Sequence, residues 1–341
     1  MRPVSAAADS RLATWVADHA GLHDVVIGNP LTGGNANVTR MITAREGRFV
    51  LRHPPTHAVS DKAAAGIARE FTAVSALAGQ APVPQPLVYC DDADVIGQPF
   101  AILEFVEGVA ITEVFPKGYG ADAVGAIGRS LIEALAAVQR VDPSPLMAQG
   151  FGRPAGFARR QVERWLGVRA DHAVRDLPLL QEIGDWLLAT APVEGAPAII
   201  HCDFHLDNCL SAPDRPEVRA VIDWEMATIG DPLVDLGLCL FFWKRDPEDA
   251  LGFPVIQAVS NRPYAPERQA LADQWSTATG RDHDALVWHM VLAAWRLAAI
   301  VEGAWLLHVQ GKAVSDYGRR LEHDVPNLLR EAQALIEGAQ R

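Results

Sequence analysis

The sequence of 341 residues has only four cysteines, Cys90, Cys202, Cys209 and Cys239, and none of them forms a CxxC pair. This spacing excludes a zinc knuckle and a dithiol redox motif, because both need closely paired cysteines. The hydrophobic share of 49% and the charged share of 21% exclude a disordered chain and a small disulfide scaffold. We therefore expect reduced thiols in a cytoplasmic protein with an ordinary hydrophobic core.

Basic residues are scarce as well, since 30 Lys and Arg stand against 42 Asp and Glu, for a net charge of −12. A nucleic-acid binder needs a basic face that displaces counterions from phosphates, and no long basic run is present. The richest basic patch contains Arg159, Arg160, Arg164 and Arg169, whose spacing is typical of one solvated helix face. We expect no nucleic-acid partner.

No uninterrupted apolar run is long enough to cross a membrane. The most apolar stretch, residues 285–309, is interrupted by His289, Arg296 and Glu302. A membrane span needs about 20 predominantly apolar residues with few charges, so this stretch predicts a buried helix and no membrane association. The first 21 residues lack a continuous apolar segment and predict an amphipathic helix rather than a signal peptide.

A length of 341 residues predicts two domains, and the composition changes near residue 108. Residues 25–52 contain three β-branched segments with turns at Gly33-Gly34 and Glu46-Gly47, which predict strands. A helix is expected from Ser60 to about residue 79, and two further strands near 86–90 and 99–106, separated by an acidic turn at residues 91–94. Residues 1–108 are therefore predicted to form a small, mostly antiparallel sheet with one inserted helix.

Residues 109–341 are dominated by the periodicity of helices. Helices are expected at 121–140, 155–168, 174–191, 232–244, 265–278, 282–311 and 325–339. A strand-rich island from residue 198 to residue 224 interrupts them. The predicted fold class is α+β, with a β-rich first domain and a mainly helical second domain.

The island at 198–224 and the residues after it carry the chemistry. Asp203 precedes Asn208 by five positions, Asp223 ends the apolar strand VRAVID, and Gly230-Asp231-Pro232 follows. Phosphoryl transfer from ATP needs one carboxylate for the acceptor hydroxyl and hard oxygen ligands for Mg²⁺. Asp203 is predicted to orient the hydroxyl and accept its proton, whereas Asn208 and Asp223 are predicted to hold Mg²⁺. Protein kinases use this Asp-to-Asn spacing in their catalytic loop.

The segments HCDFHLDN and IDWEMATIGDPLVDL resemble the H-G-D-x-x-x-x-N loop and the I-D-W-E-x-A-x-x-G-D-P-x-x-D-L signature of the aminoglycoside phosphotransferase-like small-molecule kinases. LTGGNANVTR, VLRHPP and the FFW after the GDP motif are similar to the branch found fused to acyl-CoA dehydrogenases. The resemblance runs from about residue 27 to about residue 311 and implies a protein-kinase-like two-lobed fold. Cys202 stands where the family usually has glycine.

The first domain is expected to hold the nucleotide, which is ATP, with GTP as the alternative. Gly33, Gly34 and Asn35 lie between two predicted strands, where backbone N–H groups can approach phosphate oxygens. Arg52 ends a strand where kinases place a lysine, and Glu70 on the next helix is its expected acidic partner. The hinge is predicted near residues 104–108, with adenine against the backbone of Glu104, Phe105 and Val106 and with Phe105 as a pocket wall.

The acceptor is predicted to be a hydroxyl group of a small molecule, and its class stays open between a hydroxyacyl-CoA or hydroxy acid, an amino sugar, a macrolide and an amino alcohol. Arg296 and Glu302 are candidates for its pocket, because a buried charge must be paired or functional. Arg159, Arg160 and Arg164 are the alternative. A monomer or homodimer is expected.

Two rival functions use the same residues. A nucleotide-binding pseudoenzyme would keep the fold without transfer, although Asp203, Asn208 and Asp223 are all intact. A metal-dependent hydrolase would use His201, Asp203 and His205, which alternate along one expected strand. No further His or Cys cluster with ligand spacing completes that second site.

Overall fold

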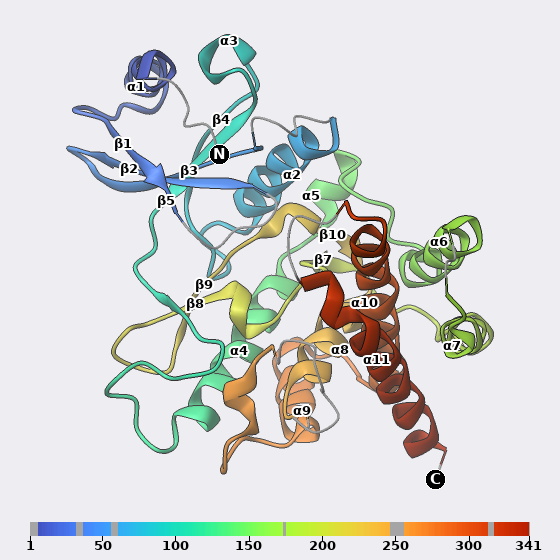
Figure 1. The fold of residues 1–341 in the computed structure, drawn as a ribbon. Coiled ribbons are helices and arrows are strands. Elements are labelled where there is room, and N and C mark those ends of the chain that lie inside the picture. Colours follow the sequence, from blue (N-terminus) through green and yellow to red (C-terminus); the bar gives the residue numbers. More distant parts are fainter. Residues whose placement is uncertain are drawn as a thin grey trace. The chain divides into compact units, whose positions relative to one another are not determined.

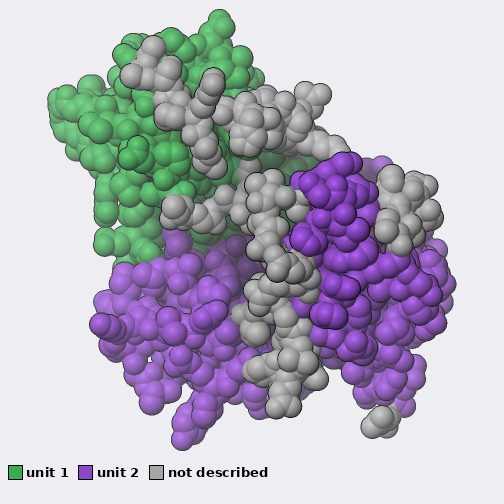
Figure 2. Space-filling view, in the orientation of Figure 1, with its two compact units in different colours: residues 1–108, 219–227 green, residues 109–218, 228–341 purple. Residues whose placement is uncertain are grey.

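The computed structural model describes residues 6–31, 37–55, 61–172, 175–245, 256–312 and 317–340. The chain divides into two compact units, coloured separately in Figure 2. Unit 1 contains residues 1–108 and 219–227, and unit 2 contains residues 109–218 and 228–341. The sequence predicts domains of residues 1–108 and 109–341. The structure groups residues 219–227 with unit 1 rather than with the mainly helical unit.

Unit 1 is built on a five-stranded antiparallel sheet with the strand order β1-β2-β3-β5-β4. The strands are β1 (Val26–Pro30), β2 (Val38–Ala44), β3 (Gly47–His53), β4 (Pro86–Cys90) and β5 (Phe100–Glu104). Helix α1 (Ala6–Ala20) precedes the sheet, and α2 (Asp61–Leu77) is inserted between β3 and β4 (Figure 1). The predicted antiparallel sheet with one inserted helix is confirmed, while the expected start of that helix at Ser60 lies outside the described residues.

The β2–β3 hairpin shows how local sequence sets the register. Ala44 faces Gly47 across a two-residue turn, and Gly47 has a φ of 144°, a conformation that residues with a Cβ rarely adopt. With this register fixed, Ile42 and Leu51 point to the same side and become fully buried. Leu12 of α1 packs into the same hydrophobic cluster.

The acidic segment at residues 91–94 forms a short helix, α3 (Ala93–Ile96), rather than the predicted turn. The Asp92 side chain accepts a hydrogen bond from the Asp94 amide at 2.8 Å, which caps the helix start. Gly97, with a φ of 83°, ends it in the left-handed conformation. Burial of Val95 and Ile96 explains why a helix wins over an open turn.

Unit 2 contains the predicted helices and two short ladders. The helices are α4 (Ala123–Arg140), α5 (Ser144–Ala148), α6 (Phe157–His172), α7 (Pro178–Ala189), α8 (Leu233–Phe242), α9 (Arg268–Thr279), α10 (Leu286–Val309) and α11 (Tyr317–Ala339). Strand β7 (Ala198–Ile200) pairs with β10 (Thr228–Gly230), and β6 (Val109–Ala110) pairs with β8 (Cys209–Ser211). Strand β9 (Val218–Val221) completes the island, and all of it except Val218 belongs to unit 1.

Helix α11 begins at Tyr317 rather than at the predicted residue 325, and it continues through Pro326. A proline inside a helix loses one hydrogen bond and normally marks a helix start. Here the turn before Pro326 buries Leu321 and Val325 completely, and α11 packs alongside α10 over most of its length (Figure 1). Tertiary packing therefore outweighs the local signal.

Helix α10 is predominantly apolar, and by length and composition it is the one described helix that could cross a membrane. Its residues from Leu286 to Val301 are mostly buried inside unit 2, as predicted for a core helix. Trp295 is fully buried, and its indole N–H donates to the Leu180 carbonyl at 2.7 Å. Trp288 is also buried.

Gly237 of α8 marks the closest approach to α10. A Cβ at this position would lie 2.7 Å from the backbone carbon of His289, so neither helix can accommodate it without moving. We expect Gly237→Ala to lower the free energy of unfolding by about 1–3 kcal/mol, the usual cost of overpacking. Urea denaturation measures this loss.

Gly303→Ala in α10 is the matched control, because nothing lies within 4 Å of its added Cβ. Replacing a helical glycine in open space stabilises a helix by about 0.5–1 kcal/mol. Equal effects of the two substitutions would contradict the close approach of α8 and α10.

Candidate active site

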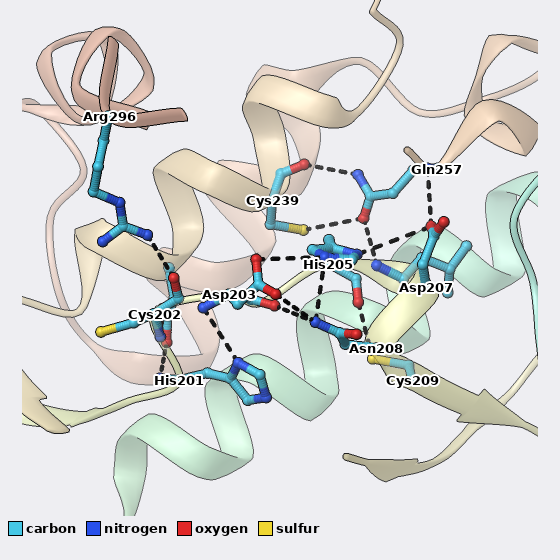
Figure 3. A network of polar contacts seen from close by, with 12 residues as sticks. His201, Cys202, Asp203, His205, Asp207, Asn208, Cys209, Cys239, Gln257 and Arg296 are labelled. Atoms are coloured by element: carbon cyan, nitrogen blue, oxygen red, sulfur yellow. Dashed lines mark hydrogen bonds and ion pairs between the residues drawn. The ribbon is translucent and has the colours of Figure 1, made fainter. Parts of the chain in front are cut away.

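The loop that follows β7 brings Asp203 and Asn208 together, as their spacing predicts (Figure 3). The Asn208 amide nitrogen Nδ2 donates to the Asp203 carboxylate oxygen Oδ2 and to the Asp203 carbonyl, both at 2.9 Å. A single 3-10 turn, Leu206–Asn208, produces this return of the chain. Because its nitrogen is committed, Asn208 keeps its side-chain oxygen as the remaining ligand atom.

Asp203 is held ionised by its neighbours. Burial by itself would raise its pKa, but the hydrogen bond and charge of His205, the charge of His201 and the Asn208 amide outweigh it and lower the pKa to about 2. His205 Nε2 lies 3.5 Å from Asp203 Oδ1. The Asp203 side chain is still 46% exposed, so an ionised carboxylate oxygen is accessible from solvent.

Asp235 anchors the backbone just before Asp203. Its carboxylate accepts the amide of His201 at 2.6 Å and the amide of Cys202 at 2.8 Å. Asp235 is completely buried, and this burial raises its pKa to about 7 although both amides and Arg296 oppose the shift. Sequence reasoning placed Asp235 in a signature but assigned it no role. The sequence feature that could have indicated this role is the position of Asp235 as the last aspartate of the GDPLVDL segment.

Cys202 adopts a left-handed backbone with a φ of 67°, a conformation that favours glycine. The departure from the family pattern therefore falls where glycine would have a conformational advantage. Its thiol is buried, and this burial raises its pKa to about 12 against the lowering effect of Arg296. Cys202 is consequently a protonated packing residue rather than a nucleophile.

Arg296 and Glu302, both predicted as candidates for the acceptor pocket, have internal partners instead. Arg296 donates to the Cys202 carbonyl (Figure 3). Glu302 forms an ion pair with Arg175, whose guanidinium also lies 4.0 Å from the ring centre of Trp305. Both buried charges therefore have a partner within the protein, which is a backbone carbonyl for Arg296 and the Arg175 guanidinium for Glu302.

The three arginines proposed as the alternative lie on α6 or its start. Arg159 is half-exposed and pairs with Glu163 one turn later. Arg160 donates to the carbonyls of Arg153 and Ala155, and the Arg164 guanidinium lies 5.2 Å from the ring centre of Trp165. These contacts agree with the solvated helix face.

Gln257 fixes the middle of the Asp203 loop, a role that no sequence motif indicates. Its side-chain oxygen accepts the Leu206 amide at 2.8 Å, and its side-chain nitrogen donates to the Cys239 carbonyl in α8 at 2.9 Å. The backbone amide of Gln257 donates to the Asp207 carboxylate oxygen Oδ1 at 3.0 Å. Gln257 is fully buried, and its side chain connects the loop to α8.

In unit 1, Arg52 lies between two carboxylates. Its Nε is 2.9 Å from Glu70 Oε2, and its Nη2 donates to Asp223 Oδ1 at 2.9 Å. The predicted pairing of Arg52 with Glu70 is confirmed, and Asp223 joins it. The Glu70 contact is an ion pair in which the carboxylate is buried. Burial disfavours the cation, but both carboxylates outweigh that effect and raise the pKa of Arg52.

Glu70 is buried among other carboxylates. Burial is the largest cause of its raised pKa, about 7, and the charges of Asp223 and Glu225 add to it against the attraction of Arg52. Asp223 is 40% exposed and has a left-handed backbone with a φ of 70°. Its second carboxylate oxygen is available to a hard cation.

The predicted hinge follows β5. The Glu104 amide donates to the Gln85 carbonyl at 2.8 Å and the Phe105 amide to the Arg48 carbonyl at 3.2 Å, so both are committed. Val106 donates to no acceptor in the described part of the chain. Phe105 is half-buried, with the Arg48 guanidinium 4.5 Å from its ring centre.

Two sequence predictions have a different outcome. Gly33, Gly34 and Asn35 lie outside the described residues, so their predicted contact with phosphate stays a prediction. The rival hydrolase site receives no support, because no group of three metal-ligating side chains occurs among the residues that the structure describes. His201 Nδ1 is instead the acceptor of the Asp203 amide at 3.2 Å.

Comparison with known proteins identifies the family. The model of the phosphotransferase enzyme family matches residues 28–271, so the chain belongs to this family. A crystal structure of a candidate aminoglycoside phosphotransferase from Ralstonia eutropha JMP134 has a TM-score of 0.81 at 26% identity, covering 95% of this chain and 98% of that one. Macrolide 2′-phosphotransferase type I has a TM-score of 0.62 at 19% identity over 96% of this chain and 99% of its own, which shows the fold alone.

Curated relatives are longer than this chain. Human acyl-CoA dehydrogenase family member 11 is 31% identical over 291 residues, which are 83% of this chain but 36% of the human protein. A probable acyl-CoA dehydrogenase of Arabidopsis thaliana is 29% identical over 301 residues, again 82% of this chain and 36% of the relative. The chain therefore spans little more than a third of these relatives. Its protein-kinase-like fold is the one that the sequence resemblance implies.

The raised pKa of Glu70 predicts a specific pH dependence of stability. A carboxyl whose pKa rises from 4.5 to about 7 on folding favours the folded state while it is protonated. Stability from this group is complete below about pH 4.5 and is lost as the pH rises through about 7. We expect wild type to lose about 1–3 kcal/mol more than Glu70→Gln between pH 5 and pH 8.

Urea denaturation of both proteins at the two pH values measures this difference. Asp235 titrates in the same range but is present in both proteins, so its contribution cancels. Parallel pH profiles for wild type and Glu70→Gln would show that Glu70 titrates normally.

Proposed function

We propose that this chain transfers the γ-phosphoryl group of ATP to a hydroxyl group of a small molecule, in the presence of Mg²⁺. The observation that carries the proposal is the ionised, accessible carboxylate of Asp203, held by Asn208 and His205 on a loop with an anchored backbone. Membership of the phosphotransferase enzyme family supports the same reaction.

Asp203 orients the acceptor hydroxyl and receives its proton. A carboxylate with a pKa near 2 is a weak base, which suits phosphoryl transfer because its transition state is loose and the proton leaves late. The main contribution of Asp203 is therefore to fix one oxygen lone pair on the hydroxyl and align it with the phosphorus. The transfer is direct, and no phosphoenzyme is formed.

Each of the two residues predicted to hold Mg²⁺ carries an oxygen donor that suits this ion. Asn208 offers an amide oxygen, because its nitrogen is occupied by Asp203, and Asp223 offers a half-exposed carboxylate. Hard oxygen ligands of this kind are those that Mg²⁺ prefers. When bound, the ion would supply charge neutralisation on the phosphates. Arg52, oriented by Glu70, would add a permanent positive charge, and Val106 would offer its backbone amide to the nucleotide base.

The acceptor class proposed first is a hydroxyacyl-CoA or hydroxy acid. The support is the name of the relatives, acyl-CoA dehydrogenases, which at 31% are more similar in sequence than the macrolide phosphotransferase at 19%. A screen of hydroxyacyl-CoAs, amino sugars, macrolides and amino alcohols with labelled ATP tests this choice. Transfer to an amino sugar alone would replace it.

Thermal unfolding with ATP, with Mg²⁺ plus ATP and with Zn²⁺ separates the rival functions. We expect the largest stabilisation with Mg²⁺ plus ATP, since a ligand that binds only the folded state stabilises it. Stabilisation by nucleotide without phosphate transfer to any acceptor or to water would favour the pseudoenzyme. A response to Zn²⁺ alone would favour the hydrolase.

Asp203→Asn is expected to keep ATP affinity and to lower kcat at least about 100-fold, because general-base contributions are typically 10²–10⁴. The amide keeps the size of the side chain and the bond from Asn208 to the Asp203 carbonyl. Single-turnover kinetics with labelled ATP measures the loss. An unchanged kcat would remove Asp203 from its assigned role.

Arg52→Lys is expected to weaken ATP binding by about 1–2 kcal/mol, less than the loss of about 1.5–3 kcal/mol expected for Arg52→Ala. Lysine restores the charge, but it cannot contact Glu70 and Asp223 with separate nitrogens as Arg52 does. Calorimetric ATP titrations of the two variants measure the difference. Arg45→Ala, at an exposed ion pair with Asp24, is the control and should leave ATP affinity unchanged.

A further inference from the structure

The peptide group between Cys202 and Asp203 is fixed at both of its polar ends (Figure 3). Its carbonyl accepts a hydrogen bond from Arg296 Nη2, and its N–H donates to His201 Nδ1 at 3.2 Å. The preceding peptide group donates its N–H to Asp235 at 2.8 Å. Two successive peptide planes are therefore held in place immediately before the Asp203 side chain.

Cys202, between these two planes, has a backbone conformation that its side chain disfavours. At a φ of 67° the Cβ of an L-residue approaches the following carbonyl oxygen, whereas glycine has no Cβ. The surrounding contacts must hold such a residue, because otherwise it relaxes toward a negative φ. A relaxation of this kind would rotate the peptide plane that leads into Asp203.

Arg296 is the contact whose presence needs an explanation. The residue is 7% exposed, and its hydrogen bond goes to the Cys202 carbonyl. Within the described chain it makes no direct ion pair, although its charge favours the ionised form of the nearby Asp235 carboxylate. A buried guanidinium loses much of its favourable hydration, and a hydrogen bond to one carbonyl restores only part of it. This carbonyl belongs to the peptide group that leads into the next residue, so its hydrogen bond to Arg296 can fix the direction of the chain there. The only catalytic candidate that follows it directly is Asp203.

We propose that Arg296 is a positioning residue for phosphoryl transfer, which holds Cys202 in the left-handed conformation and thereby aims the Asp203 carboxylate. The inference rests on the proposed function for its kinetic consequence. It makes the role of Arg296 conditional on Cys202, because a glycine at position 202 adopts the same conformation without restraint.

Four proteins test the proposal: wild type, Arg296→Met, Cys202→Gly and the double variant. With Mg²⁺ and ATP, and with water as acceptor where no alcohol is identified, Arg296→Met should lower kcat about 10- to 100-fold, the usual effect of misplacing a reacting group. The KM for ATP should stay within about twofold, because Arg296 acts on the acceptor side. In the Cys202→Gly background the same substitution should cost less than about threefold.

Arg268→Met is the matched control, because Arg268 also donates to backbone carbonyls, those of Phe241 and Trp243 at the end of α8. This variant should lower the Tm and leave kcat unchanged. The same kcat loss for Arg296→Met with Cys202 and with Gly at position 202 would overturn the proposal, and so would an equal loss in Arg268→Met. Arg296→Lys, which keeps the charge without the fork, should recover part of kcat and serves if Arg296→Met does not fold.

Hydrogen exchange of the peptide spanning residues 201–208 tests the restraint without any activity. Exchange should be faster in Arg296→Met than in wild type and should return toward the wild-type rate in the double variant. If wild type transfers no phosphate even to water, the proposed function fails while this measurement still decides the restraint. Unchanged exchange in Arg296→Met would overturn the restraint whatever the activity.

Discussion

The carboxylate of Asp235 is the contact on which the candidate active site depends. Its two oxygens accept the successive amides of His201 and Cys202 in a fully buried position. An acceptor with two oxygens can satisfy both amides at once, which a backbone carbonyl in a regular strand cannot do for neighbouring residues. The chain can therefore leave β7 and turn sharply without leaving buried donors unpaired.

Around this anchor the loop is assembled from several directions. Asn208 ties the loop back on Asp203 from within, Gln257 ties its middle to α8, and Arg296 reaches it from α10. Each of these residues also hydrogen-bonds to a backbone atom of the loop: the Asp203 carbonyl, the Leu206 amide and the Cys202 carbonyl. Catalysis by positioning needs a rigid loop, and hydrogen bonds to backbone atoms supply rigidity whatever the side chains in the loop are.

Local spacing predicted the parts of this site that lie close in sequence. Asp203 and Asn208 are five residues apart on one turn, and Arg52 with Glu70 follows the strand-to-helix order of kinases. The roles of Asp235 and Gln257 could not be predicted, because the loop amides that they hold are more than 30 residues away and the contacts depend on tertiary packing. Arg296 was recognised as a buried charge, but its partner is a carbonyl, which no residue type in the sequence reveals.

The cysteines give the protein a practical property. All four are buried and free of disulfides, and burial raises the pKa of each thiol. Thiol reagents attack the thiolate, so the native cysteines react slowly in the folded state. A single cysteine introduced at an exposed position, such as Val193, which is 98% exposed, would thus become the dominant labelling site without removal of the native four. A dye or spin label at this position would report on unit 2, while Cys202, the residue before Asp203, keeps its own side chain.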